Sequence, residues 1–215
     1  MKLTIRWKYL STAAFLAMLV FAGTIPAFAD TYHIADFSGA MFGGNANVKP
    51  PFLGNGFEPG GPVTGSFVFD DQLVPAAGSA FVNVFFSTFP DSGNIPPATA
   101  FTINLGTTPL TFTLAEAMNG SGAIQYNNGN FNGFFFQTDF PFEGNQYRFD
   151  NQGGVWNIQQ LINNVPTFQN LVSGFINIGG GNLTNIRPFV PTVPAPGTLL
   201  LLGSGMAALI GFRKK

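Results

Sequence analysis

The sequence predicts an all-β protein, a single β-sandwich or jelly-roll domain flanked by an N-terminal signal helix and a C-terminal transmembrane helix. Three observations favour strands in the middle of the chain. Phenylalanine accounts for 26 of the 215 residues, whereas charged residues make up only 9%. Phe, Val and Thr favour strands, while the scarce Lys and Glu favour helices. Apolar and polar residues alternate with a period of two in several runs, and Asn/Gly-rich clusters separate these runs.

The alternation is clearest in three runs, residues 63–70, 101–105 and 110–114, and each predicts a strand. The last two runs flank Gly106-Thr107-Thr108-Pro109, which predicts a β-hairpin. We expect one helical turn at residues 114–118 and a long loop at residues 45–61. Further strands are expected at residues 31–37, 81–88, 133–139, 146–149, 155–159 and 171–178.

A short theme recurs in which a polar residue precedes a glycine close to phenylalanine. The glycines of this theme are Gly39, Gly65, Gly133 and Gly174. Two interpretations remain open, the remnant of an ancient duplication and the ordinary strand chemistry of a Phe-rich sheet. The second interpretation is favoured.

The N-terminus is typical of a secretory signal peptide. A basic segment is followed by an apolar run at residues 10–25, and Pro26 ends that run. The tripeptide Ala27-Phe28-Ala29 matches an A-x-A cleavage site, which predicts a cut between Ala29 and Asp30. The alternative is an uncleaved membrane anchor, although the apolar run is short for a membrane span.

The C-terminus combines a Pro-Xaa-Pro turn, an uncharged apolar segment and a basic tip. Residues 198–212 carry no charge and, as a helix, would extend about 22 Å, less than the roughly 30 Å bilayer core. Snorkelling of Arg213, Lys214 and Lys215 and local bilayer thinning would make up the difference. The positive-inside rule keeps this tip cytoplasmic and places the domain outside the membrane. The alternative is a buried C-terminal helix of the domain.

The tail resembles the PEP-CTERM sorting signal, which membrane proteases called exosortases recognise. The matching residues are Val193, Pro194 and Pro196, the apolar helix, and the basic tip Arg213, Lys214 and Lys215. Ala195 stands where the family usually has Glu, so this is a Pro-Ala-Pro variant of the motif. The resemblance implies cleavage near the motif, followed by release or transfer to the cell surface.

These segments define the expected organisation of the chain. A signal peptide at residues 1–29 precedes the β-sandwich domain at residues 30–185. A Pro-rich spacer with the sorting motif follows at residues 186–197, and the transmembrane helix at residues 198–212 ends in the basic cytoplasmic tip at residues 213–215.

The region between the two terminal segments is acidic. Six of the nine Lys and Arg residues lie in the terminal segments, so three basic residues remain against ten acidic ones, a formal net charge of −7. This charge argues against nucleic-acid partners and against an anionic membrane surface. The chain has no cysteine, which excludes disulfides and thiolate metal sites.

Few residues are candidates for chemistry. The single histidine, His33, is the residue that a Ser-His-Asp triad would require, but we expect it to occupy a strand or an exposed position. Asp70 and Asp71 are the only adjacent acidic pair and could bind Ca²⁺ together with Asp36 or Asp150. The alternative for this pair is a solvated strand end, so calcium binding remains open.

Two further patterns allow alternative interpretations. Trp156, Tyr126, Tyr147 and Tyr32 could stack on carbohydrate, although packing in the core or at a sheet edge is favoured for all four. Asn182-Leu183-Thr184 matches a glycosylation acceptor pattern with a high false-positive rate.

The expected function is that of an exported, non-catalytic cell-surface or extracellular-matrix protein that needs no cofactor. The alternatives are a polysaccharide-binding module and a secreted hydrolase that uses carboxylates. The expected partners are the secretion machinery with its signal peptidase, an exosortase-like membrane protease and the membrane around the C-terminal helix. Extracellular polysaccharide is a candidate ligand. The protein would be anchored in the membrane transiently and then reach the cell surface or the medium.

Overall fold

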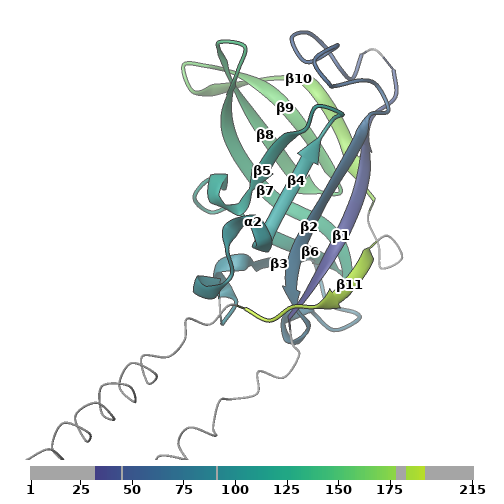
Figure 1. Cartoon of the computed structure of the whole chain (residues 1–215), viewed down its shortest axis with the longest axis vertical. Coiled ribbons are helices and arrows are strands. Elements are labelled where there is room, and N and C mark those ends of the chain that lie inside the picture. The colour runs from purple at the N-terminus through teal and green to yellow at the C-terminus, as the bar shows by residue number, and fades with distance from the viewer. Residues whose placement is uncertain (1–31, 45, 91, 178–182, 192–215) are drawn as a thin grey trace, which may run out of the picture. The chain divides into compact units, whose positions relative to one another are not determined.

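The computed structural model describes residues 32–44, 46–90, 92–177 and 183–191. These residues form eleven strands and little helix (Figure 1). The helical segments described are α2 (Pro97–Ala100) and four short 3-10 helices at Asp71–Leu73, Phe86–Thr88, Ser92–Asn94 and Leu114–Glu116. The strands are β1 (Tyr32–Met41), β2 (Pro62–Asp70), β3 (Val82–Phe85), β4 (Phe101–Leu105), β5 (Leu110–Thr113), β6 (Ala123–Asn127), β7 (Asn130–Phe142), β8 (Asn145–Gly153), β9 (Val155–Ile162), β10 (Val165–Ile176) and β11 (Thr184–Pro188).

All eleven strands belong to one open antiparallel sheet that curls over itself. The strand order is β3-β6-β7-β8-β9-β10-β1-β2-β4-β5, and β11 pairs with β1 beside this path. The two halves of the sheet face each other, because the Phe134 ring of β7 lies 4.9 Å from Phe37 of β1 and 4.8 Å from Phe101 of β4. The predicted all-β class is confirmed. The separate sheets of a sandwich or jelly-roll are replaced by one sheet that is continuous where β10 pairs with β1.

The β1–β10 seam joins the two halves. Three register pairs form it, with Gly39 opposite Ile176 and Gly174 opposite Met41 at its two ends. Strand β11 pairs with the other part of the same β1 edge, where His33 of β1 lies opposite Pro188 of β11. Residues 186–188, expected in the Pro-rich spacer, therefore belong to the sheet.

Most expected strands are confirmed, in several cases with longer bounds. The hairpin between β4 and β5 turns through residues 106–109, as expected. The helical turn expected at residues 114–118 is the 3-10 helix Leu114–Glu116. The strand expected at residues 81–88 is shorter, because Phe86–Thr88 forms a 3-10 helix. Strands β6 and β11 are additional to the strands that the sequence predicts.

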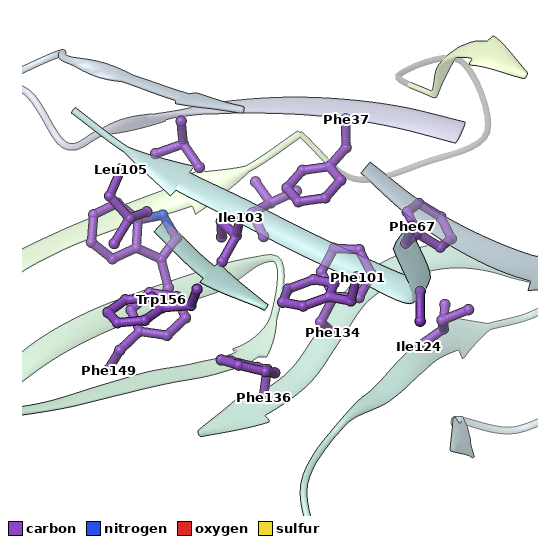
Figure 2. Packing of buried hydrophobic residues seen from close by; sticks show 14 of the residues in the cluster. Phe37, Phe67, Phe101, Ile103, Leu105, Ile124, Phe134, Phe136, Phe149 and Trp156 are labelled. Carbon is purple, nitrogen blue, oxygen red and sulfur yellow. The ribbon is translucent and has the colours of Figure 1, made fainter. Parts of the chain in front are cut away.

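Phenylalanine rings fill the space between the two halves of the sheet. Figure 2 shows Phe101 and Phe134 close together near the centre of this core, where their rings meet edge to face, with Trp156 and Phe149 at one side of it. Phe134, Phe149 and Trp156 are each fully buried. Because the chain has no cysteine, this packing takes the place of a disulfide framework.

Each glycine of the recurring theme lies where another backbone approaches closely. A Cβ added at Gly39 would lie 2.1 Å from the Phe175 carbonyl oxygen, and one at Gly65 would lie 2.2 Å from that of Thr102. The corresponding distances are 1.9 Å from Gly153 O for Gly133 and 2.4 Å from Ala40 O for Gly174. The theme is therefore explained by strand packing, without a need for duplication.

A capping box closes the 3-10 helix Leu114–Glu116. The backbone N–H and the hydroxyl of Thr113 donate to Glu116 Oε2 at 2.7 and 2.6 Å, and Ala115 N–H donates to Thr113 Oγ1 at 3.3 Å. The bond from the Thr113 side chain is the main cause that lowers the pKa of Glu116 below its ordinary value.

This box predicts acid-dependent stability. A carboxylate with a lowered native pKa stabilises the fold above its unfolded pKa, and this stabilisation is lost as the pH falls through the native value. We expect the thermal midpoint of the wild type to fall more steeply between about pH 6 and pH 3 than that of Glu116→Gln, as measured by circular dichroism. Parallel curves for the two proteins would contradict the assignment.

The expected signal helix and transmembrane helix lie outside the described residues. The same holds for Ala27, Ala29 and Asp30, for the sorting-motif residues from Val193 onward, and for Asn182. Within the described part of the chain, no helix is both long and apolar enough to span a membrane.

Candidate functional site

His33 makes structural contacts on β1. Its Nδ1 lies 3.2 Å from Asp71 Oδ2, and its ring stacks on Phe69 with centroids 5.5 Å apart. Its contacts in the described part of the chain are thus an acid and an apolar ring. The expectation of a strand position is confirmed.

Asp70 and Asp71, the adjacent acidic residues at the end of β2, have different surroundings. Asp70 is buried, and its Oδ1 accepts a 2.9 Å hydrogen bond from Gln72 N–H at the start of a 3-10 helix. Asp71 is more than half exposed and faces His33 instead. Asp150 accepts from Gln137 on β7, at 3.2 Å. Within the described residues, no three acidic or histidine side chains gather as a metal site, so the calcium candidate finds no support there.

The four aromatic residues considered for carbohydrate stacking are all core residues. Trp156, Tyr147, Tyr32 and Tyr126 are exposed by only 0%, 1%, 3% and 5%. Burial, with smaller contributions from Asp71 and Asp70, also raises the pKa of the Tyr126 hydroxyl. None of the four presents a ring to solvent, so the stacking role is wrong and the packing role is confirmed.

The outward faces of β1, β2, β4 and β5 carry rows of small polar side chains. In one row Ser38 lies opposite Thr64, Thr64 opposite Asn104, and Asn104 opposite Thr111. In the second row Asp36 lies opposite Ser66, Ser66 opposite Thr102, and Thr102 opposite Thr113. Residues directly across neighbouring strands are about 5 Å apart, so each row forms a continuous line of hydrogen-bonding groups.

The members of these rows on β1, β2 and β4 line a shallow groove of about 410 Å³, which we call the hydroxyl groove. Strands β1, β2 and β4, which lie side by side in Figure 1, form its floor. Thr184, the first residue of β11, borders it. Its lining residues are Asp36, Phe37, Ser38, Thr64, Gly65, Ser66, Thr102, Asn104 and Thr184.

Asp36 is the charged residue of the hydroxyl groove, and strand β11 neutralises it. Asn185 Nδ2 donates to Asp36 Oδ2 at 2.8 Å, and Arg187 Nη1 lies 3.5 Å from Asp36 Oδ1. The pairing of β11 with β1 brings both side chains to the carboxylate. The groove therefore combines many hydrogen-bonding groups with a compensated charge.

Several of these groups retain free hydrogen-bonding capacity. The hydroxyls of Thr64 and Ser66 make no hydrogen bond with any described residue. Asn104 accepts from Thr111 Oγ1 at 2.7 Å, which orients its amide and leaves Nδ2 available as a donor. Ser38 Oγ accepts from Asn177 Nδ2 at 3.3 Å and can still donate.

A second surface groove, of about 530 Å³, lies where the loop 54–57 meets the tips of the β4–β5 and β7–β8 hairpins. Its carboxylate, Glu143, accepts from Asn55 Nδ2 at 2.7 Å. Each of the two grooves is thus lined by one carboxylate. Glycoside hydrolysis by the usual mechanism requires two carboxylates that flank the bond, and neither groove supplies that pair.

A family model described as the PEP-CTERM protein-sorting motif matches residues 192–215. This match confirms the resemblance that the tail shows in the sequence, and it implies export with processing by an exosortase in the membrane. No curated protein and no solved structure matches the chain.

Proposed function

From the match of residues 192–215 to the PEP-CTERM protein-sorting motif, we propose that the chain is a non-catalytic protein of the cell surface or extracellular matrix. The β domain is the cargo, and the tail from residue 192 directs its sorting. The single observation that carries this proposal is the sorting motif at residues 192–215.

The character of the described domain supports a role outside the cell. An excess of seven negative charges between the terminal segments keeps a domain soluble and discourages self-association. Its stability depends on a core of aromatic rings rather than on cysteines, so it is insensitive to the redox state of its surroundings. A non-catalytic role is also consistent with the single carboxylate in each groove.

Removing the basic tip tests this function. We expect the combined substitution Arg213→Ser, Lys214→Ser and Lys215→Ser to impair sorting strongly, because a cationic tip fixes the orientation of the preceding apolar segment. Immunoblots of fractionated bacteria that encode an exosortase should show the wild type at the surface or in the medium. The variant should be depleted there by about tenfold or more, the effect of losing roughly 1.4 kcal/mol of recognition.

The matched control is Arg213→Lys, which keeps the charge and should be sorted as the wild type is. Deletion of the exosortase should reproduce the effect of the triple substitution. If the wild type occurs only in the cytosol, or if the triple variant is sorted normally, the proposal fails.

A further inference from the structure

We infer that the hydroxyl groove on β1, β2 and β4 is a binding site for a neutral polysaccharide. The inference rests on the proposed function in one respect, since only an exported domain meets extracellular glycans. The site itself is carried by the geometry of the groove and not by the sorting motif.

The chemistry of the lining matches a polyhydroxylated ligand. A Ser or Thr hydroxyl both donates and accepts hydrogen bonds, and so does a sugar hydroxyl. Thr64, Ser66 and Asn104 present such capacity on neighbouring strands, in two lines that cross the strands. A polymer lying along these lines would find a regular series of partners, whereas a small apolar ligand would leave them unsatisfied.

The charge of the groove selects a neutral ligand. The Asp36 carboxylate is paired with Arg187, whose Nη1 lies 3.5 Å from Asp36 Oδ1. The described residues of the groove therefore offer no unpaired charge to a charged ligand. An acidic polysaccharide would also meet a domain with a net charge of −7. An uncharged glycan needs no unpaired charge in the groove and is not repelled by the net charge of the domain.

The groove is pre-organised by hydrogen bonds that hold its lining side chains in place. Thr102 Oγ1 donates to the Ala98 carbonyl of α2, and Thr111 holds the Asn104 amide from the next strand. Side chains fixed on strands lose little freedom on binding. Phe37 lies in the floor but is only 2% exposed, so the groove has no open aromatic platform. Binding should therefore be weak for one sugar and strengthened by repeated contacts along a polymer.

The inference is tested with the purified full-length chain in detergent, applied to immobilised polysaccharides. The neutral probes are dextran, hydroxyethylcellulose and galactomannan, and the acidic probe is alginate. We expect retention on at least one neutral probe, with alginate bound at least about tenfold more weakly. The double substitution Thr64→Val and Asn104→Leu should lower affinity for that neutral probe by about tenfold or more, because it leaves ligand hydroxyls unpaired.

Two further variants separate binding from folding. Ser66→Ala removes one free hydroxyl with little effect on a strand and should weaken binding by several-fold. Gln152→Leu changes an exposed amide on β8, outside the groove, and should bind as the wild type does. Circular dichroism checks that each variant is folded.

The inference is overturned if no neutral probe is retained, if alginate binds equally well, or if the groove variants bind as tightly as the wild type. None of these results depends on sorting, because the purified chain is used. Conversely, the serine variant of the basic tip should lose its surface location and keep its affinity for the probe. Failure of the sorting proposal and failure of the binding inference are thereby distinguishable.

Discussion

Gly174→Ala is expected to destabilise the domain severely, because Gly174 lies at the β1–β10 seam that joins the two halves of the sheet. An added Cβ would lie 2.4 Å from the Ala40 carbonyl oxygen and 2.5 Å from Trp156 Cζ2. The first obstacle is the backbone of the neighbouring strand and the second is a fully buried ring, so neither can move aside cheaply. We expect a loss of about 3 kcal/mol or more, which lowers the thermal midpoint by roughly 10 °C.

The matched control is Gly43→Ala, because nothing lies within 4 Å of a Cβ built at Gly43. Unfolding of both variants can be followed through the fluorescence of the buried Trp156. An unfolding midpoint for Gly174→Ala equal to that of the control would show that the seam is not packed as described.

Phe134→Ala is expected to cost about 4 kcal/mol, because this residue is the centre of the aromatic core. Its fully buried ring lies within about 5 Å of four others: the centroid distances are 4.8 Å to Phe101, 4.9 Å to Phe37, 5.0 Å to Phe67 and 5.2 Å to Phe131. These rings come from both halves of the sheet. Removal of the Phe134 ring leaves a cavity between the two halves that the rigid strands cannot close.

Phe168→Ala is the control for this substitution, since Phe168 is 81% exposed. It removes the same ring and should change the free energy of unfolding by less than about 0.5 kcal/mol. Guanidinium unfolding curves measure both values. Equal effects of the two substitutions would contradict the placement of Phe134 between the halves.

The strands that the sequence predicts are those with one buried and one polar face. Residues 101–105 alternate clearly, and β4 has the same bounds. Strand β6 has no such alternation, because its first four residues, Ala123 to Tyr126, are all buried. Every residue of β11 is exposed and the strand ends in a proline, so its sequence resembles a spacer. Its place in the sheet depends on the free edge of β1, which local sequence does not encode.

The order of the strands separates the predicted sandwich from the observed sheet. The sequence predicts strands at residues 31–37 and 133–139, but it does not show that β10 pairs with β1. The glycines Gly39 and Gly174 were the local signal of this seam, since each marks a close approach. The sequence shows these glycines as a recurring theme, but it does not show which strand approaches each of them.

The hydroxyl groove could be predicted only in part. Thr64, Ser66, Thr102 and Asn104 occupy the polar positions of predicted strands, so their outward direction follows from period-two alternation. Their convergence requires β2 to lie between β1 and β4, which is a property of the sheet order. The aromatic candidates failed for the opposite reason. Trp156 lies on the inward face of β9, where a large ring stabilises the core and meets no ligand.

The intact mass of the chain recovered from outside the cell tests the central claim most directly. Export and sorting predict a product that begins at Asp30 and lacks the apolar segment and basic tip at residues 198–215. Its mass would be well below the 22.9 kDa of the full chain. A protein found only in the cytosol, with both terminal segments intact, would contradict the account.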